Sequence, residues 1–306
     1  MVRPLEKTIA IIGPTASGKS SLSLALAKKI KAEIVNCDSV QVYKDFNIGS
    51  AKPNKEELEE VPHHLLDIVS WKDPFDASQY RSLAMQSIEE ILGRKKTPLL
   101  TGGTGLYFRA LCGVKFHDLP SDLSLRKKLD SFSNEELYLK LLELDPTRAR
   151  ELHLNDRFRL ARACEVALLT GRSLSSFTTP EEKETSRPYT ILCKPPREDL
   201  LKKIELRSKK MLEDGLIEEV EGLLKSGCPD YAKPMQSIGY LQVCEYIKNK
   251  TSKDQLLDKI IIATRQYARK QVKWFRQVPV DLVLDHPYDL DSSIEEILKL
   301  LSSRTK

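Results

Sequence analysis

Residues 13–20 constrain the fold of this 306-residue chain more than any other segment. They read GPTASGKS and match G-x-x-x-x-G-K-[ST], the pattern of a phosphate-binding loop. The apolar run Ile9–Ile12 before the loop predicts a strand, and Ser21–Ile30 after it has apolar residues at helical spacing. In that context the loop amides and the helix N-terminus favour an anion. We therefore expect a polyphosphate site.

The loop combines backbone donors with two side chains that have roles of their own. Lys19 brings a positive charge to the phosphates, and the hydroxyl of Ser20 is placed to ligate Mg²⁺. The other residues expected to bind the phosphates are Gly13, Pro14, Thr15, Ala16, Ser17 and Gly18. A tight turn without a ligand is the competing interpretation, which the flanking strand and helix disfavour. The loop does not specify which polyphosphate binds.

Size and composition are those of a soluble globular protein with one large or two modest domains. Hydrophobic residues make up 41% and charged residues 30% of the chain, and no segment approaches the roughly 20 apolar residues of a membrane span. The N-terminus runs into the first strand without a cleavable leader, so we expect a cytoplasmic protein. The formal charge of +5 permits a nucleic-acid partner without requiring one.

The spacing of cysteine and histidine residues gives no indication of a zinc site. The six cysteines are scattered and form no C-x-x-C pair, which predicts reduced and mostly buried thiols. The pair His63–His64 has no partner at metal-ligand spacing, and we interpret it as structural. Mg²⁺ at the phosphate loop is therefore the one metal that we predict.

The order of apolar runs predicts an α/β fold with a doubly wound parallel sheet, like that of P-loop NTPases. Five runs have the length of strands, at residues 7–12, 33–37, 97–101, 189–194 and 280–285, with helical patterns between them. The interval between the third and fourth runs is too long for one crossover and holds only helical patterns. We therefore expect a core of residues 1–113 and 188–306 and an inserted all-helical domain at 114–187.

Local patterns set further expectations within these domains. A capping box at 133–136 predicts the start of one helix, and Asp156 is placed to cap another that ends near Gly171. Ser, Thr, Pro and Glu dominate residues 173–188, which predicts a mobile loop. Residues 199–225 predict one long helix that stops at Gly227, and residues 253–277 predict a second.

A carboxylate and a second glycine-rich turn are the candidate reactive groups. Asp38 follows the second strand, where ligands bind in open α/β sheets, and can act as a base or hydrogen-bond acceptor; the alternative is that it caps the next turn. The third strand runs into TGGTGLY at 101–107, where the backbone can approach a substrate closely. Motor-type NTPases often place a Mg²⁺-binding acid here. Its absence argues against that class, although small-molecule kinases vary at this point.

Two helical segments carry basic residues that suit phosphate contacts. In the inserted domain these are Arg157, Arg159 and Arg162, with Glu165 nearby. In residues 253–277 a stripe at i, i+4, i+8 and i+11 comprises Arg265, Arg269, Lys273 and Arg276, interleaved with Tyr267, Trp274 and Phe275. Such a stripe suits RNA, whereas a solvated face over inward-packing aromatics is the alternative. Arg207 could clamp an anionic ligand or pair with an acid on its own helix.

With these motifs in place, the chain resembles the tRNA dimethylallyltransferases, also called tRNA isopentenyltransferases. The matching segments span nearly the whole chain and are specific in their order: GPTASGKS, DSVQVYKDFNIGSAKP at 38–53, VPHHLLDI at 61–68, TGGTGLY at 101–107, NDRFRLARACEV at 155–166, R-x3-M-x3-G at Arg207, Met211 and Gly215, SIGYLQ at 237–242 and TRQYARKQVKWFR at 264–276. The resemblance implies transfer of a dimethylallyl group from dimethylallyl diphosphate to the exocyclic amine of the adenosine immediately 3′ of the tRNA anticodon.

The resemblance also implies roles for single residues. The phosphate loop would hold the diphosphate leaving group, with Lys19, Mg²⁺ on Ser20 and Arg207 stabilising its charge. Asp38 would accept a hydrogen from the adenine amine, and Thr104 would bond near the reacting groups. The inserted domain and the C-terminal basic helix would grip the anticodon loop while the base leaves its stack. The residues implied to contact tRNA are Asp38, Ser39, Val40, Gln41, Thr104, Phe158, Arg159, Arg162, Arg265, Arg269, Lys273 and Arg276.

The sequence departs from the family pattern at three points. Ser20 stands where many members have Thr, and either hydroxyl can ligate Mg²⁺. Phe158 stands where many bacterial members have Gln, so a polar interaction with tRNA would be missing or replaced by stacking. The zinc-finger extension of eukaryotic relatives is absent, which implies a bacterial enzyme, and we expect a monomer.

Three other functions fit parts of the sequence. An adenylate isopentenyltransferase would modify free AMP, ADP or ATP, but it needs neither the basic stripe nor the inserted domain. A small-molecule kinase would use the phosphate loop for ATP. A non-catalytic RNA-binding protein would have no use for Asp38 and Thr104 beside an intact loop.

Overall fold

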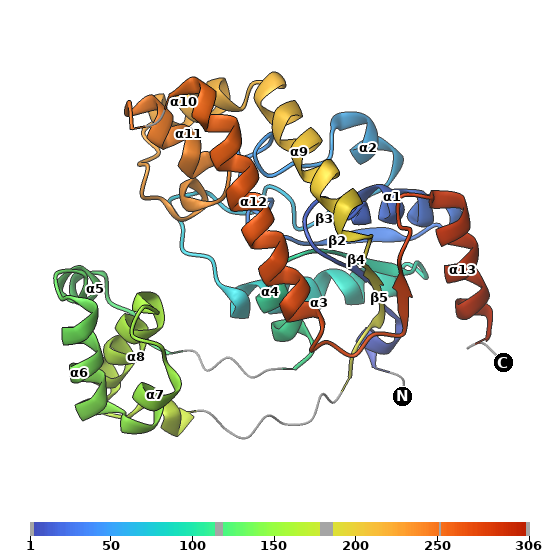
Figure 1. The fold of residues 1–306 in the computed structure, drawn as a ribbon. Helices are drawn as coiled ribbons and strands as arrows, with labels where there is room; N and C mark the ends of the chain where they lie inside the picture. The colour runs from blue at the N-terminus through green and yellow to red at the C-terminus, as the bar shows by residue number, and fades with distance from the viewer. Residues whose placement is uncertain (1–2, 114–118, 178–185, 251, 304–306) are drawn as a thin grey trace. The chain divides into compact units, whose positions relative to one another are not determined.

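Figure 1 shows the computed structural model of the chain, which describes residues 3–113, 119–177, 186–250 and 252–303. The chain divides into two compact units. One is formed by Met1–Cys112 together with Ser186–Lys306, and the other by Gly113–Thr185. The larger unit contains the sheet, and the smaller unit is a set of helices.

The larger unit is built on a six-stranded sheet whose neighbouring strands are all parallel. In the order β3-β2-β4-β1-β5-β6, the strands are His63–His64, Glu33–Cys37, Pro98–Gly102, Ile9–Ile12, Tyr189–Cys193 and Leu282–Leu284. The five predicted strands are confirmed, and the α/β class with them. The sixth strand, β3, was missed because two histidines form no apolar run.

Helices cover both faces of this sheet. Ile9 and Ile11 of β1 pack with Leu22 and Leu26 of α1 and with Ile297 of α13. The alternate side chains of β1 are also buried, and α3 and α4 pack together against that second face (Figure 1). The helices of this unit are α1 (Lys19–Ile30), α2 (Lys55–Glu60), α3 (Ala77–Gly93), α4 (Gly105–Leu111), α9 (Arg197–Glu213), α10 (Leu216–Lys225), α11 (Tyr240–Ile247), α12 (Lys253–Phe275) and α13 (Leu290–Ser303), with 3-10 turns η1 (Pro4–Lys7) and η3 (Lys233–Gln236).

The predicted single helix over 199–225 is wrong, because the chain breaks it into α9 and α10. Gly215 lies between the two helices with φ at 100°, a left-handed conformation that glycine adopts without a steric penalty. The second predicted helix is confirmed as α12. The break directs Arg207 on α9 and the residues of α10 along separate axes.

The smaller unit contains α5 (Leu123–Asp130), α6 (Asn134–Leu144), α7 (Pro146–Glu151), α8 (Arg157–Thr170) and the 3-10 turn η2 (Leu174–Phe177). The capping box of α6 forms as predicted, since Ser133 accepts from the amide of Glu136. Asp156 does not cap α8 through its side chain, because its carboxylate pairs with Arg159 instead. Part of the predicted mobile loop is the ordered turn η2, and residues 178–185 of that prediction lie outside the described residues.

The prediction of buried, reduced cysteines is confirmed for the part of the chain that the structure describes. All six cysteines are buried and none forms a disulfide there. No cluster of three or more His, Cys, Asp or Glu residues suited to a metal occurs in the same residues. Among the helices described, none is both long enough and apolar enough to cross a membrane.

Glu33, at the start of β2, is a buried carboxylate surrounded by cations. Its oxygens accept from His64 Nε2 at 2.7 Å and from Arg94 Nη2 at 2.7 Å, and lie 3.1 Å from Lys96 Nζ. Burial alone would raise the pKa of Glu33, but the hydrogen bonds from Arg94, His64 and Lys96 outweigh it and hold the pKa at about 2. His64 therefore has a structural contact, as predicted for the histidine pair.

We expect the substitution Glu33→Gln to lower the free energy of unfolding by about 2 kcal/mol near neutral pH, because the amide loses charge-assisted hydrogen bonds. A carboxyl whose pKa is depressed in the folded state stabilises the fold above its unfolded pKa, near 4.5, and loses that contribution as the pH falls. Urea unfolding should therefore show that the difference in unfolding free energy between wild type and E33Q shrinks by more than half near pH ~3. The exposed Glu59 on α2 supplies the control variant E59Q. If this difference did not depend on pH, ionised Glu33 would not be the stabilising group.

Candidate active site

The three glycine-rich or acidic motifs meet at the carboxyl ends of adjacent strands. The phosphate loop follows β1, Asp38 follows β2, and the turn at 102–105 follows β4, which lies between the other two. The strand ends are level, because Gly102 is in register with both Ile12 and Cys37. A Cβ at Gly102 would lie 2.1 Å from the carbonyl oxygen of Cys37, so only glycine allows this approach. The position is the expected one for ligands in a parallel sheet.

A cavity of about 770 Å³ opens at this edge of the sheet. The phosphate loop contributes residues 15–20, and the segment after β2 contributes Asp38, Ser39, Val40 and Gln41. Arg207 and Met211 line it from α9, and Tyr267 and Gln271 line it from α12. The residues predicted for the phosphate loop and the substrate segment thus share one cavity.

Two half-buried cations, Lys19 and Arg207, line this cavity. Burial and, to a smaller extent, the charge of Arg207 lower the pKa of Lys19 to about 8, while the charge of Asp38 opposes the shift. Burial likewise lowers the pKa of Arg207, again opposed by Asp38. Lys19 Nζ donates to the carbonyl of Pro14 at 3.1 Å. Desolvated positive charge of this kind favours a bound anion.

Asp38 forms the turn cap that the sequence offered as the alternative to a part in catalysis. Its Oδ1 accepts from the amides of Val40 at 2.8 Å and Gln41 at 3.3 Å, so the residue does cap the turn. Among the described residues Oδ2 accepts no hydrogen bond, and it is the oxygen available to a ligand. Thr104 lies behind this segment, with its Oγ1 accepting from the amide of Ser39 at 3.0 Å.

The rest of the segment after β2 is held by α10. Glu219 accepts from the backbone amides of Asn47, Ile48 and Gly49, and from the hydroxyl of Tyr240 at 2.6 Å. Gln41 links the beginning of this segment to its end, since its Nε2 donates to the carbonyls of residues 50 and 51. The cavity wall around Asp38 is therefore anchored by side chains rather than by a regular strand.

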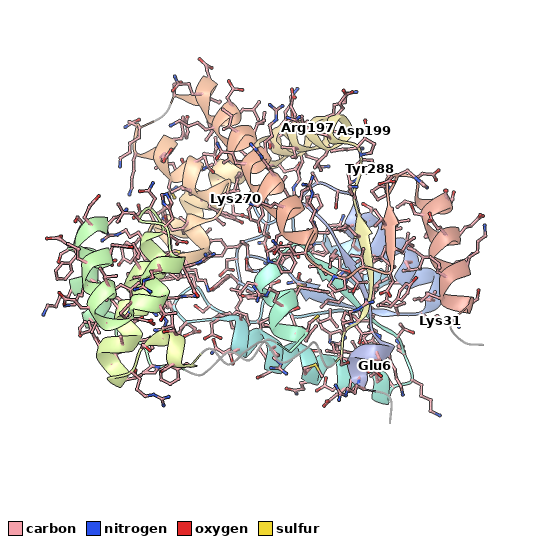
Figure 2. The ribbon with its side chains drawn as sticks, turned by 60° about the horizontal axis from the view of Figure 1, so that its bottom comes forward. Glu6, Lys31, Arg197, Asp199, Lys270 and Tyr288 are labelled. Carbon is pink, nitrogen blue, oxygen red and sulfur yellow. The ribbon has the colours of Figure 1, made fainter. Side chains whose placement is uncertain are left out.

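Two residues that contact the phosphate loop were not predicted from the sequence. Gln271 accepts from the amide of Thr15, and Tyr288 donates to the carbonyl of Ala16 at 2.9 Å. Tyr288 also lies near Asp199 in the first turn of α9 (Figure 2), and burial together with that charge raises its pKa to about 12. The inward spacing of Gln271 with Ala268 and Phe275 was a usable indication, whereas the segment around Tyr288 offered none.

On α12 the structure separates the basic residues from most of the aromatics. All four basic residues of the stripe are exposed: Arg265, Arg269, Lys273 and Arg276. Phe275 is buried and Trp274 packs edge-on against Phe108, so both follow the inward-packing alternative. Tyr267 lines the cavity. The outer face of α12 is left as a cationic surface.

The arginines of the smaller unit differ in their availability. Arg157 donates to the carbonyls of Phe132 and Asp130, and Arg162 donates to Glu165 and to the carbonyl of Leu119. These contacts give both side chains a structural part in the unit. Arg159 and Phe158 are exposed, and Phe158 is 81% exposed. These last two residues are the accessible part of the predicted set.

The fold and the cavity define a P-loop enzyme of the α/β class whose phosphate loop faces a carboxylate rather than a strand-end metal-binding acid. The sequence pattern of the family described as IPP transferase matches residues 41–278. The tRNA dimethylallyltransferase of Geobacter metallireducens is 42% identical over 302 residues, covering 96% of this chain and 97% of that protein. The chain therefore belongs to the IPP transferase family.

Solved structures agree with this assignment. The full-length tRNA isopentenylpyrophosphate transferase of Bacillus halodurans is 33% identical, with a TM-score of 0.72 over 97% of this chain and 96% of that one. A eukaryotic dimethylallyltransferase acting on tRNA is 26% identical, with a TM-score of 0.81 over 97% of this chain and 79% of the other. The prediction of the fold and the family from sequence motifs is confirmed.

The lowered pKa of Lys19 predicts how anion binding depends on pH. Protonated Lys19 attracts inorganic diphosphate, so the dissociation constant should rise above pH ~8 by up to about tenfold per pH unit. Isothermal titration with Mg²⁺-diphosphate measures this dissociation constant. For K19M it should vary with pH only as far as the diphosphate itself titrates. K29M, at an exposed lysine of α1, is the matched control. Equal profiles for wild type and K19M would remove Lys19 from the anion site.

Proposed function

We propose that this cavity transfers a dimethylallyl group from dimethylallyl diphosphate to the exocyclic amine of the adenosine immediately 3′ of the tRNA anticodon. Membership of the IPP transferase family supports this activity. The shared cavity supports roles for three residues in this reaction, because the phosphate loop with Lys19 and Arg207 lines it together with Asp38. Family membership does not support a kinase, and an adenylate transferase would not need the cationic face of α12.

The leaving group is the first requirement of this reaction. The carbon–oxygen bond of the donor breaks and its electron pair stays on the diphosphate, so negative charge develops at that oxygen. Lys19 and Arg207 are partly desolvated, and with the loop amides they are in place before the reaction begins, which strengthens their interaction with the developing charge. No nucleotide hydrolysis is required.

Mg²⁺ fits the residues of the loop. Ser20 lines the cavity at the start of α1 and offers a hydroxyl oxygen, whereas the described residues offer no cluster of acids for a metal. A Mg²⁺ ion that arrives with its diphosphate needs only such a ligand, because it retains water and phosphate oxygens. When bound, the ion would neutralise part of the charge on the diphosphate.

The nucleophile is the second requirement. An adenine amine is weak because its lone pair is delocalised into the ring, and a new carbon–nitrogen bond leaves positive charge on that nitrogen. Asp38 Oδ2 would accept a hydrogen from the amine and finally take the proton. Thr104 holds the backbone of Ser39 beside Asp38, and so supports the position of the carboxylate. Val40 and Gln41 would shape the pocket around the base.

The tRNA would contact two accessible cationic surfaces, one in each unit. One is formed by Arg265, Arg269 and Lys273 on α12 with Arg276 at its C-cap, and the other, in the smaller unit, by Arg159 with Phe158. Phosphate contacts from the arginines and lysines position the loop, and exposed Phe158 offers a face for stacking. Arg162 would act mainly by holding the smaller unit together.

One assay separates the candidate activities. Purified protein is incubated with radiolabelled dimethylallyl diphosphate, Mg²⁺ and either unmodified tRNA or AMP. We expect label in tRNA alone. Label in AMP alone would establish the adenylate transferase, and label in neither would overturn the prenyl-transfer proposal.

The substitution Asp38→Asn tests the carboxylate. The Asn side chain can still accept from the amide of Val40, so the turn is kept while the base is lost. We expect the single-turnover rate to fall by about 100-fold or more, with tRNA affinity nearly intact. Normal single-turnover chemistry with a large loss of tRNA binding would refute the catalytic role.

The substitution Lys273→Ala tests the stripe on α12. Removing one ion pair between a basic side chain and an RNA phosphate reduces the slope of log affinity against log salt concentration by about 0.7 to 0.9. We expect weaker tRNA binding and a shallower slope, measured by fluorescence anisotropy. Lys270 is exposed on the same helix outside the stripe, and K270A should keep the slope. An unchanged slope for K273A would assign Lys273 to an ordinary solvated face.

A further inference from the structure

We infer that Gln271 is a positioning residue of the transfer reaction, which fixes the phosphate loop against the glycine-rich turn after β4. The inference rests on the proposed function and adds a residue to it. Gln271 lies on α12, and neither the phosphate-loop pattern nor the family roles described above assign it a part.

The side-chain amide of Gln271 forms one hydrogen bond to each loop. Its Oε1 accepts from the amide of Thr15 at 2.8 Å, and its Nε2 donates to the carbonyl of Gly103 at 2.8 Å. The side chain is buried, with 7% of the residue exposed. The amide of Thr15 needs an acceptor and the carbonyl of Gly103 needs a donor, and one neutral side-chain amide supplies both. We call this pair of hydrogen bonds the Gln271 bridge.

The two loops are close enough at this point for the bridge to set their spacing. A Cβ at Gly103 would lie 2.5 Å from Gln271 Nε2, 3.2 Å from the carbonyl oxygen of Gly13 and 3.6 Å from the Lys19 side chain. One turn further along α12, Trp274 packs on Gly105, where a Cβ would lie 2.5 Å from its ring. The helix is thereby fixed to the start of α4 next to the bridge.

This placement connects three parts of the proposed reaction. The phosphate loop holds the leaving group, the turn after β4 leads to Thr104 beside the Asp38 segment, and the outer face of α12 carries the cationic stripe. A shift between the first two would change the distance from the reacting carbon to the adenine amine. Reaction rates depend steeply on such distances, so the bridge should affect the chemical step more than tRNA binding.

The first test replaces Gln271 with Met, which keeps the volume and removes both hydrogen bonds. We expect the single-turnover rate at saturating donor and tRNA to fall about tenfold or more, with the tRNA dissociation constant within about twofold of wild type. Gln266 is exposed on the same helix, and Q266M should retain the wild-type rate. Thermal unfolding of both variants checks that they fold.

The second test, Gln271→Glu, has a readout that packing alone would not move. An ionised carboxylate still accepts from Thr15 but repels the carbonyl of Gly103, whereas the protonated acid can donate to that carbonyl. The ratio of the Q271E rate to the wild-type rate should therefore rise about tenfold as the pH falls from about 8 to about 5.5. Using the ratio cancels the titration of the other groups.

The outcomes distinguish this inference from the proposed function. Absence of label transfer to tRNA by the wild-type protein would overturn the proposed function. An active wild type with an unaffected Q271M would overturn the bridge, and so would a Q271E ratio that stays flat with pH. If Q271M does not fold, the pH profile of Q271E decides.

Discussion

Two desolvated cations, Lys19 at the start of α1 and Arg207 on α9, set the electrostatic character of the cavity. Lys19 and Arg207 are close enough that Arg207 lowers the pKa of Lys19, and burial lowers the pKa of both. Asp38 is the carboxylate that opposes these shifts, and one negative charge does not balance two positive ones. The cavity is therefore electrostatically complementary to a further anion. A diphosphate supplies that anion, and its departure with the bonding electrons increases the charge that the two cations meet.

Most of the fold could be predicted from the sequence because buried parallel strands are continuous apolar runs. Three features were not predicted correctly, each for a physical reason. β3 is only two histidines long and is held by the Glu33 cluster rather than by hydrophobic burial. The break at Gly215 was hidden because one glycine is compatible with a helical pattern, and only its positive φ reveals the turn. Asp156 has the right residue type for a cap, but its carboxylate pairs with a competing cation.

The candidate site was predictable where its chemistry lies next to strand ends. Glycine loops and the acid after β2 are local patterns, and the parallel topology brings them together. Gln271 and Tyr288 contact the phosphate loop across 256 and 272 residues of sequence. Helical spacing indicates that Gln271 faces inward, but it does not indicate which residue Gln271 contacts. The same limit applies to the arginines of the smaller unit. Their spacing indicated a basic surface, but whether each faces solvent or a backbone carbonyl is set by packing.

The break between α9 and α10 also constrains the number of residues between Arg207 and Gly215. In one continuous helix, Arg207 and Glu219 would lie about 18 Å apart along the axis and about a third of a turn around it. Ending α9 before Gly215 lets Arg207 face the anion site while Glu219 binds the amides of 47–49. The interval from Arg207 to Gly215 is a little over two helical turns, about 12 Å. A single residue inserted there would rotate Arg207 by about 100° relative to the break. The segment therefore tolerates substitution far better than any change of length.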